Sequence, residues 1–251
     1  MEFENYKVLV VGSTSGIGLA TTKMFLDEGA TVIGLGRNFD KTKDLGDTFI
    51  PYKCDVTDPN QIKASCDFVK KTFGNKLDVL VDSAGIGVHE SVKSVTIERF
   101  DEAINLLLRH HVFFTAYLCE SLYNGDSKDP VIIHVSSNAS RTIQSDNILY
   151  GMCKTALNLY IKQCAQGLHG IRVFSISPGT IATAIFSRGD HTRTSEQVQD
   201  YFNLLSNSVI PAGRVAEPFE VADLVSFLCS KEASYMTGFD CLIDGGLMHR
   251  A

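Results

Sequence analysis

Four polar side chains stand at a spacing that suits proton transfer at the oxygen of an alcohol or a carbonyl. Tyr150 and Lys154 are four residues apart, so a helix would place both on one face. A free tyrosine has a pKa of about 10, too high for acid–base work at neutral pH, but a nearby ammonium lowers it. We expect Tyr150 to be the acid–base group and Lys154 its activator. Ser137 would bind the carbonyl oxygen, and Asn105 would hold a water that links Lys154 to solvent.

Each of these residues also has an ordinary structural interpretation. A tyrosine and a lysine at this spacing can be a surface pair on a helix, Ser137 can cap the end of a strand, and Asn105 can be a plain polar helix residue. Their joint occurrence in this order favours the catalytic interpretation.

A glycine-rich turn near the N-terminus predicts a dinucleotide site. Residues 12–18 read GSTSGIG and follow the apolar run Lys7–Val11. Gly12 permits a tight turn, Gly16 lets the backbone approach a pyrophosphate, and Gly18 lets the next helix pack close to the sheet. The N–H groups at the start of that helix would face the phosphates. The alternative is a turn that only connects a strand to a helix.

The residues after the second strand bear on the choice between NADP and NAD. An NAD site usually has an acid here to bind the ribose hydroxyls, but this chain has Gly36 followed by Arg37. A guanidinium can pair with a 2′-phosphate, so we expect NADP, with NAD as the alternative. Arg37 as a solvated loop residue also remains open. Asp55 could accept from the adenine amino group or could be an acid favoured at a helix N-terminus.

The elements that must position these groups alternate between strand-like and helix-like segments. Seven apolar runs are the strand candidates: Lys7–Val11, Thr31–Leu35, Phe49–Lys53, Leu77–Val81, Val131–Val135, Arg172–Ile176 and Asp240–Ile243. Most are continuously apolar, which indicates strands buried on both faces of a parallel sheet. Helix signals include Asp58-Pro59 and Glu217-Pro218. Long helices are expected at 96–123 and 149–168. The pattern predicts a doubly wound α/β fold.

Length and composition exclude several classes of protein. The 251 residues contain no linker or repeat, so we expect one domain spanning 1–251. The net charge of −6 argues against nucleic-acid binding, and no apolar stretch is long enough for a membrane helix. The seven cysteines are scattered, without zinc spacing, and no signal peptide is visible. Free thiols and a cytoplasmic location are therefore expected.

Taken together, these motifs resemble those of the short-chain dehydrogenase/reductase family over nearly the whole chain, in particular its 3-ketoacyl reductase and hydroxysteroid dehydrogenase-like members. The matching residues are Gly12, Gly16-Ile17-Gly18, Asp55-Val56, Ala84-Gly85, Asn105, Ser137, Tyr150, Lys154, Pro178-Gly179 and Asp244-Gly245-Gly246. The resemblance implies a Rossmann-type sheet of about seven parallel strands. It also implies reversible oxidation of an alcohol by NAD(P), with the four polar residues in the roles given above.

The same likeness extends the expected cofactor site. Thr183 and the backbone of Ile181 would meet the nicotinamide carboxamide. The full cofactor-binding set is expected to comprise Gly12, Ser13, Ser15, Gly16, Ile17, Gly18, Arg37, Asp55, Val56, Ala84, Gly85, Tyr150, Lys154, Pro178, Gly179, Ile181 and Thr183. A homodimer or homotetramer is implied, with the long helices around 100–123 and 149–168 at its main interface.

Two positions depart from the family pattern. Val11 stands where threonine is usual, and Asp82-Ser83 stands where Asn-Asn is usual. In the family those polar groups hold neighbouring strands together. We expect that bond to be lost as a unit here and replaced by apolar contact or by Ser83, since replacing both partners costs little. The adjacent His110 and His111 are expected on the interface helix and, without a carboxylate or cysteine in view, not as metal ligands.

Substrate specificity is expected from residues 184–209, a polar segment suited to a lid. Its aromatic and leucine residues could form an apolar wall or simply pack in a helix: Phe186, Tyr201, Phe202, Leu204 and Leu205. Arg188, His191 and Arg193 could meet an anionic substrate such as a phosphopantetheine, or could be solvated.

Three hypotheses for function follow. The first is an NADP-preferring alcohol dehydrogenase or ketoreductase for a small or medium secondary alcohol: a steroid, a sugar-like polyol or a 3-ketoacyl thioester. The second is an NAD(P)-sensing protein of the same fold without catalysis. The third is a scaffolding oligomer that no longer binds nucleotide. The catalytic set argues against the second, and Gly12, Gly16 and Gly18 argue against the third.

Overall fold

The computed structural model describes residues 1–187 and 193–249 and contains a seven-stranded, fully parallel sheet in the order β3-β2-β1-β4-β5-β6-β7. The strands are β1 (Lys7–Val11), β2 (Thr31–Gly36), β3 (Phe49–Lys53), β4 (Val79–Asp82), β5 (Val131–Val135), β6 (Arg172–Pro178) and β7 (Asp240–Ile243). The predicted doubly wound α/β fold is thus confirmed. The strand order reverses between β1 and β4, where folds of this kind bind ligands at the carboxyl ends of the strands.

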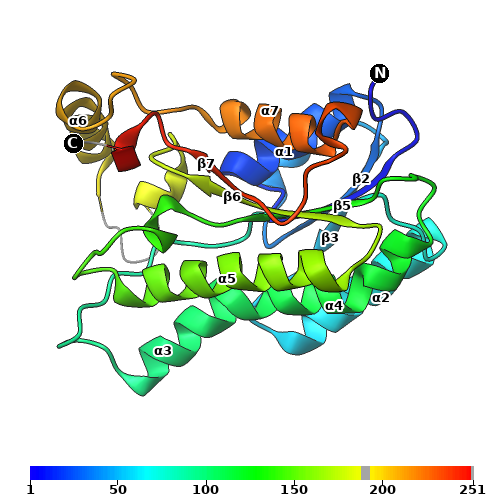
Figure 1. Cartoon of the computed structure of the whole chain (residues 1–251), viewed down its shortest axis with the longest axis horizontal. Helices are drawn as coiled ribbons and strands as arrows, with labels where there is room; N and C mark the ends of the chain where they lie inside the picture. The colour runs from blue at the N-terminus through cyan, green and yellow to red at the C-terminus, as the bar shows by residue number, and fades with distance from the viewer. Residues whose placement is uncertain (188–192, 250–251) are drawn as a thin grey trace.

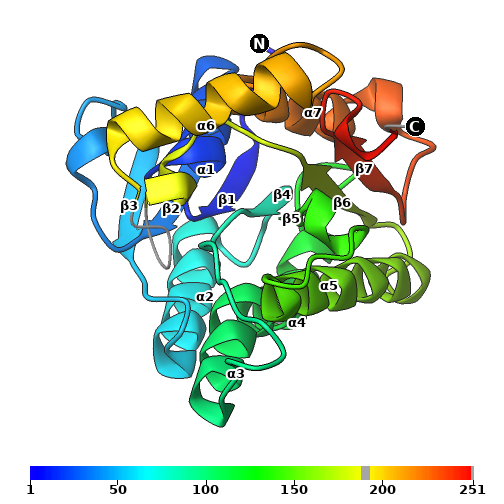
Figure 2. The ribbon, with the colours of Figure 1, turned by 90° about the vertical axis from the view of Figure 1, so that its left-hand side faces the viewer.

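The continuous apolar runs form strands because helices cover both faces of the sheet (Figure 1). The helices are α1 (Gly16–Asp27), α2 (Pro59–Phe73), α3 (Ile97–Ile104), α4 (His110–Tyr123), α5 (Ile148–Gly167), α6 (Ser195–Ser208) and α7 (Pro218–Cys229). Helices α1 and α7 pack together on one face, and α2, α4 and α5 lie on the other. Figure 2 shows the sheet between these two layers. Helix α6 lies at one end of the molecule, seen at the upper left of Figure 1.

Alternate residues of β1 pack into two separate hydrophobic cores, one on each face of the sheet. Val8 and Val10 of β1 point into the layer of α1 and α7, where they join Phe25 and Val225. Leu9 and Val11 point the opposite way, into the layer of α2, α4 and α5. All of these side chains are fully buried, which is why the β1 run shows no polar alternation.

Helix ends follow local chemistry, whereas several strand ends differ from the sequence-based expectation by one or two residues. The Asp58 side chain accepts from the Asn60 N–H at 2.9 Å and caps α2 ahead of Pro59, as predicted. Strand β4 runs to Asp82 rather than to Val81, because that carboxylate is neutralised by groups distant in sequence.

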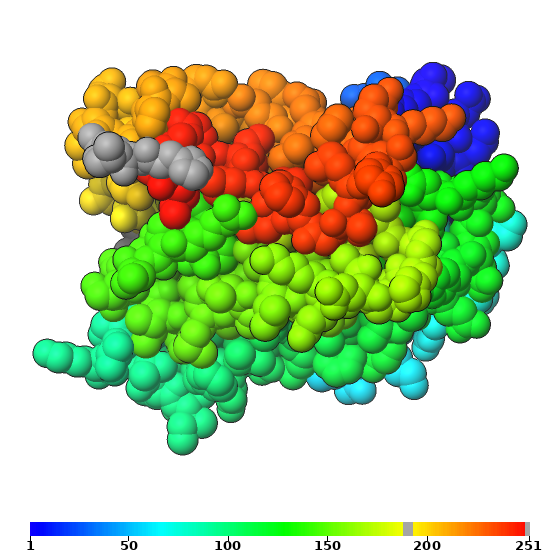
Figure 3. Space-filling view, viewed as in Figure 1, coloured from blue at the N-terminus to red at the C-terminus, as the bar shows by residue number. Residues whose placement is uncertain are grey.

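The long helix expected over 96–123 is interrupted. A π-helical turn at Asn105–Arg109 separates α3 from α4. The chain around α3 projects from one corner of the molecule (Figure 3). Among the described residues, no helix is long and apolar enough to span a membrane.

Candidate active site

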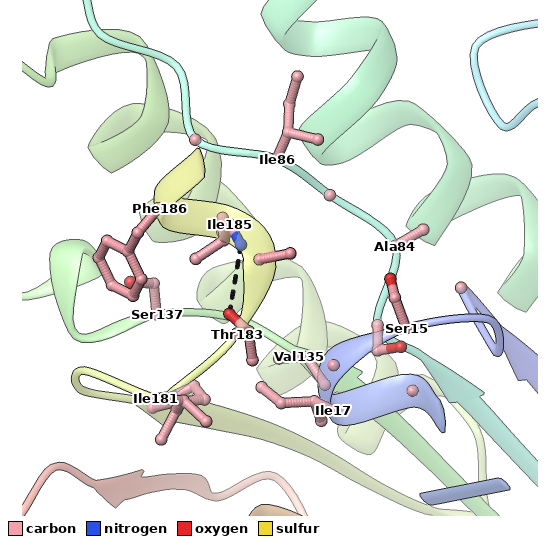
Figure 4. Close-up of a pocket in the computed structure, with 18 of the residues that line it drawn as sticks. Ser15, Ile17, Ala84, Ile86, Val135, Ser137, Ile181, Thr183, Ile185 and Phe186 are labelled. Carbon is pink, nitrogen blue, oxygen red and sulfur yellow. Dashed lines mark hydrogen bonds between the residues drawn. The ribbon is translucent and has the colours of Figure 1, made fainter. Parts of the chain in front are cut away.

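A cavity of about 1150 Å³ opens at the carboxyl edge of the sheet, at the β1–β4 switch point. It lies between the start of α1, which carries Ser15 and Ile17, and the turn that carries Ile185 and Phe186 (Figure 4). Most of the predicted site residues line it: Gly12, Ser15, Gly16, Ile17, Gly18, Arg37, Asp55, Val56, Ala84, Gly85, Ser137, Tyr150, Lys154, Pro178, Gly179, Ile181 and Thr183. Ser13 and Asn105 are not among the lining residues.

The glycine turn has the geometry that only glycine permits. Gly12 and Gly16 have φ values of 82° and 53°, in the left-handed region. A Cβ on Gly18 would lie 2.2 Å from the Gly12 carbonyl oxygen, so the helix packs against its own turn without room for a side chain. A Cβ on Gly16 would lie 3.1 Å from the Thr183 methyl group, inside the cavity. Gly12, Gly16 and Gly18 thus keep these three positions of the turn clear of side chains.

The start of α1 supplies positive charge to this space. Its N-cap residue, Ser15, makes no side-chain cap, and its first turn holds no acid. The first N–H groups of a 12-residue helix thus face the cavity with an uncompensated positive dipole. Such a helix end binds a pyrophosphate well. The cleared turn and this helix end fit a dinucleotide.

The packing at one end of the cavity explains why Gly36, and not an acidic residue, ends β2. A Cβ on Gly36 would lie 2.4 Å from the Thr14 methyl group, so Thr14 occupies the space that a side chain at position 36 would need. Arg37 is exposed, and Arg37 and Lys41 both line this end. Hydrogen bonds from Thr57 and the charge of Arg37 outweigh desolvation and lower the pKa of Asp55.

Sequence reasoning placed Ser13 in the cofactor set, but Thr14 is the residue that faces the cavity. Ser13 is fully buried, and its hydroxyl donates to the Leu35 carbonyl at 3.2 Å. Thr14 lines the cavity instead. The signal that could have indicated Thr14 is Gly36, the residue without a side chain that it covers.

Tyr150 and Ser137 meet at the inner end of the cavity. Ser137 follows β5 at the start of a 3-10 turn, where its oxygen accepts from the Ala139 N–H at 3.1 Å. Burial raises the pKa of Tyr150, and a hydrogen bond with Ser137 opposes that rise. The expected lowering of this pKa by Lys154 is not found, and the Lys154 ammonium donates to the Val135 carbonyl instead of to the phenol.

Lys154 follows Tyr150 by about one turn of α5. Its Nζ donates to the Val135 carbonyl at 2.9 Å and lies 5.8 Å from the centre of the Tyr150 ring. The residue is 3% exposed, and burial lowers its pKa to about 8, against the charges of Asp82 and Cys153. A partly desolvated cation therefore stands next to the phenol.

Asn105 begins the π-helical turn between α3 and α4. Turns of this type are rare and occur frequently at functional sites. Asn105 itself does not line the cavity, whereas its neighbour Leu106 does. Its part in a proton relay remains a prediction.

The end of β6 and the segment after it line one side of the cavity, and their expected contact with a nicotinamide remains a prediction. The Gly179 N–H donates to Ile243 on β7 at 2.9 Å, and a Cβ on Gly179 would lie 2.7 Å from that of Asp244. Asp244 in turn accepts from the Gly246 N–H at 2.9 Å. The Asp-Gly-Gly motif thus fixes the strand end that leads to Ile181 and Thr183.

The predicted lid segment lines the cavity only in part. Phe186, Tyr201 and Leu205 reach it, whereas Phe202 is buried against Phe186, with ring centres 5.2 Å apart, and Leu204 is 59% exposed. Of the cations proposed for an anionic substrate, Arg193 lies 4.7 Å above the Tyr201 ring. Arg188 and His191 fall outside the described residues.

Four polar residues that sequence reasoning missed also line the cavity: His89, Thr142, Gln144 and Asn147. Asn147 donates to Gln144 at 2.9 Å. Within the described part of the chain, the Asn147 amide oxygen and the Thr142 hydroxyl are buried without a hydrogen-bond partner. No spacing rule connects these four residues to the site, so only the fold reveals them.

The two departures from the family pattern are resolved by the structure. The Ser83 hydroxyl donates to the Val11 carbonyl at 3.0 Å, so Ser83 replaces the expected bond between the strands. His110 and His111 lie at the start of α4, the helix expected for them, but the premise that no carboxylate lies near them was wrong. Both are fully buried and directed at the sheet, and the carboxylate that seemed missing is Asp82, 2.8 Å from His110 and 3.1 Å from His111.

Known proteins resemble this chain in sequence over most of its length. The family model described as enoyl-(acyl carrier protein) reductase matches residues 11–248. The 3-oxoacyl-[acyl-carrier-protein] reductase of Thermotoga maritima is 33% identical over 257 residues, which cover 99% of this chain and 100% of that protein.

Two solved structures share the fold over their whole length. Aldohexose dehydrogenase from Thermoplasma acidophilum, in ligand-free form, has a TM-score of 0.88 and 30% identity, covering 99% of this chain and 96% of that one. L-sorbose reductase from Gluconobacter frateurii, complexed with NADPH and L-sorbose, has a TM-score of 0.89 and 26% identity, covering 100% of both chains.

Proposed function

The chain belongs to the short-chain dehydrogenase/reductase family, and from this we propose that it is an NADP-preferring oxidoreductase acting on a secondary alcohol or its ketone. One observation carries the proposal. Tyr150, Ser137 and Lys154 line the same cavity as the cleared glycine turn and the uncapped start of α1. A dinucleotide held there would extend toward the Tyr150 end.

The chain's own residues supply the proton chemistry. A bound nicotinamide would give or take the hydride. Tyr150 would donate its phenolic proton to the carbonyl oxygen as the alcohol forms, and Ser137 would donate a hydrogen bond to the same oxygen. The Lys154 ammonium, 5.8 Å from the ring centre, would stabilise the phenolate that remains. Asn105 would hold the water that returns a proton through Lys154.

We infer the preference for NADP from Thr14 and Arg37. Thr14 fills the position where an acid would bind the ribose hydroxyls, and Arg37 with Lys41 puts positive charge at the same end. A guanidinium pairs well with a phosphate dianion. The NADPH complex of L-sorbose reductase supports this choice.

For the substrate, we propose a small polyhydroxylated ketone or alcohol. The unpartnered oxygens of Thr142 and Asn147 belong to residues that line the same cavity as Phe186 and Tyr201. Such oxygens favour a ligand with several hydroxyl groups over a steroid, because a buried unpaired polar group costs about 1–3 kcal/mol. The likeness to aldohexose dehydrogenase and L-sorbose reductase supports the same class.

The proposal is tested by binding and then by turnover. The purified protein would be titrated with NADPH and separately with NADH while nicotinamide fluorescence is measured. The background is low because the chain has no tryptophan. A panel of hydroxyketones, steroid ketones and 3-ketoacyl thioesters would follow. Tighter NADPH binding and turnover of hydroxyketones support the proposal. Binding without any turnover would favour a nucleotide sensor, and no binding would favour a scaffold.

We also propose that the whole chain, 1–251, acts as one domain with a lid at 184–209, in the cytoplasm, as a homodimer or homotetramer. Exposed apolar side chains on α4 and α5 support the assembly: Phe113, Tyr117, Met152 and Leu159. Light scattering on the purified protein would measure its mass. A monomer at micromolar concentration would contradict this part.

A further inference from the structure

A cluster of ionisable side chains lies buried beneath the active site and takes no part in the mechanism above. Asp82 ends β4, His110 and His111 begin α4, and His134 lies beside Asp82 in the sheet register. All four side chains are 0% exposed. Buried charged groups of this kind are rare unless they are paired, so their pairing must be accounted for.

The hydrogen-bond partners of His110 indicate which of its two ring nitrogens carry a hydrogen. Its Nε2 lies 2.9 Å from the Leu106 carbonyl, which can only accept, so Nε2 carries a hydrogen. Its Nδ1 lies 2.8 Å from Asp82 Oδ2. Burial would raise the pKa of Asp82, but His110 and His111 hold it well below its usual range. The Asp82 oxygens also have two further nitrogen neighbours, the Ala84 N–H at 3.2 Å and His111 Nδ1 at 3.1 Å, which fits a carboxylate that only accepts. Such a carboxylate needs a hydrogen on His110 Nδ1 as well as on Nε2, so the geometry indicates an imidazolium.

The other two imidazoles complete the cluster in neutral form. His111 Nδ1 lies 3.1 Å from Asp82 Oδ2 and 2.9 Å from His134 Nδ1, and His134 Nε2 lies 2.9 Å from the Thr115 hydroxyl. Burial lowers the pKa of His111 well below its usual value and that of His134 to about 4. The cluster thus contains one carboxylate, one imidazolium and two neutral rings.

Three members of this cluster contact or adjoin segments of the active site. Asp82 Oδ1 accepts from the N–H of Ala84, which lines the cofactor cavity, at 3.2 Å. His110 follows the π-helical turn that begins at Asn105. His134 precedes Val135, whose carbonyl receives Lys154 Nζ. Asp82 and His110 therefore lie next to three segments of the active site: the chain at Ala84, the turn that begins at Asn105 and the strand end that anchors Lys154.

We propose that Asp82 and His110 form a buried ion pair whose members are positioning residues, holding the Asn105 turn in place and keeping Lys154 charged. The catalytic part of this proposal rests on the proposed function, whereas the ion pair itself does not. The charge of Asp82 opposes the burial that lowers the pKa of Lys154. Without that charge, Lys154 would lose its proton at lower pH and could no longer stabilise the Tyr150 phenolate.

The titratable groups around the pair come from every element packed against it. They are His111 on α4, His134 on β5, Lys154 on α5, and Cys54 after β3, on whose thiol the Asp82 charge acts. The ring of Tyr160 on α5 lies 6.5 Å from that of His134. Burial raises the pKa of both Cys54 and Tyr160, so neither carries charge near neutral pH.

A divalent metal is the competing occupant. Ligating atoms of Asp82, His110 and His111 lie within 4.8 Å of one another. A metal there would require His110 Nδ1 to be unprotonated, because a ligating nitrogen cannot carry a hydrogen. The ion pair requires the opposite, so the protonation of His110 separates the two.

The first test does not depend on activity. Nitrogen-15 NMR of the histidine rings in the wild-type protein should show both His110 nitrogens protonated at pH 7, with that signal lost in Asp82→Asn. A neutral His110 in the wild-type protein would overturn the ion pair. So would one equivalent of metal per chain by elemental analysis, present in the wild type and absent from Asp82→Asn.

The second test measures the effect on catalysis against a matched control. Asp78 is also buried and immediately precedes β4, but it accepts from the Lys7 and Ser127 N–H groups and does not line the cavity. Asp82→Asn should lower kcat about tenfold and move the alkaline limb of kcat/KM down by about half a pH unit or more. Asp78→Asn should destabilise the fold and leave the pH profile in place. Identical profiles for both variants would overturn the positioning role. A wild type without turnover would refute the proposed function and leave the NMR test intact.

Discussion

Lys154 Nζ lies 5.8 Å from the centre of the Tyr150 ring while it donates to the Val135 carbonyl at 2.9 Å. The lysine is thus anchored to the sheet beside the phenol rather than bonded to it. Burial acts on both groups, raising the pKa of Tyr150 and lowering that of Lys154 to about 8. The charge that the phenolate needs is therefore itself sensitive to pH.

This sensitivity predicts the alkaline limit of the reaction. Below its pKa of about 8 Lys154 is an ammonium, and above it the charge is lost. We expect kcat/KM for carbonyl reduction to fall as pH rises through about 8. Lys154→Arg should move this limb to higher pH, since arginine keeps its charge, at a lower kcat. A pH profile of both proteins checks this, and an unmoved limb in the variant would contradict it.

The buried imidazoles predict how stability depends on pH. The pKa of His134 falls from 6.5 to about 4 on folding, so the unfolded chain binds more protons in that window. Stability should be constant above pH 6.5 and fall by about 3 kcal/mol as the pH drops to 4, from this group alone. Urea unfolding at several pH values measures the slope. His134→Asn should flatten it, and a slope equal to that of the wild type would contradict this origin.

Arg37 is predicted to select NADPH. A charged hydrogen bond to a phosphate contributes about 1.5–3 kcal/mol, so Arg37→Ala should weaken NADPH binding roughly tenfold or more and leave NADH binding unchanged. Lys63, exposed on α2 outside the residues that line the cavity, provides a control as Lys63→Ala. Equal loss of both cofactors would mean that Arg37 does not contact the 2′-phosphate.

The bond between Ser83 and Val11 predicts a small and asymmetric effect of mutation. Because the Ser83 hydroxyl already reaches the Val11 carbonyl, Val11→Thr should add less than about 1 kcal/mol of stability. Ser83→Ala should cost about 1 kcal/mol, as it leaves that carbonyl short of a donor. Thermal and urea unfolding of the two variants would show it. A larger gain from threonine would mean that the usual family bond can still form.

The sequence predicted most strands and the glycine turn because their signals are local. Continuous apolar runs mark buried strands, and Gly12 and Gly18 mark close backbone approach. The buried cluster escaped prediction because Asp82 lies 28 residues from His110, and neither residue alone indicates burial. The π-helical turn escaped as well, since one extra residue hardly changes the apolar spacing around Asn105.

The most direct test of the account compares NADPH consumption by the wild type and by Tyr150→Phe with the best hydroxyketone of the panel. Both proteins should bind NADPH equally by fluorescence titration, because phenylalanine removes only the hydroxyl. We predict that the wild type turns over and that the variant loses at least about a hundredfold in kcat. A variant that binds and turns over like the wild type would contradict Tyr150 as the acid, and with it the reaction proposed for this site.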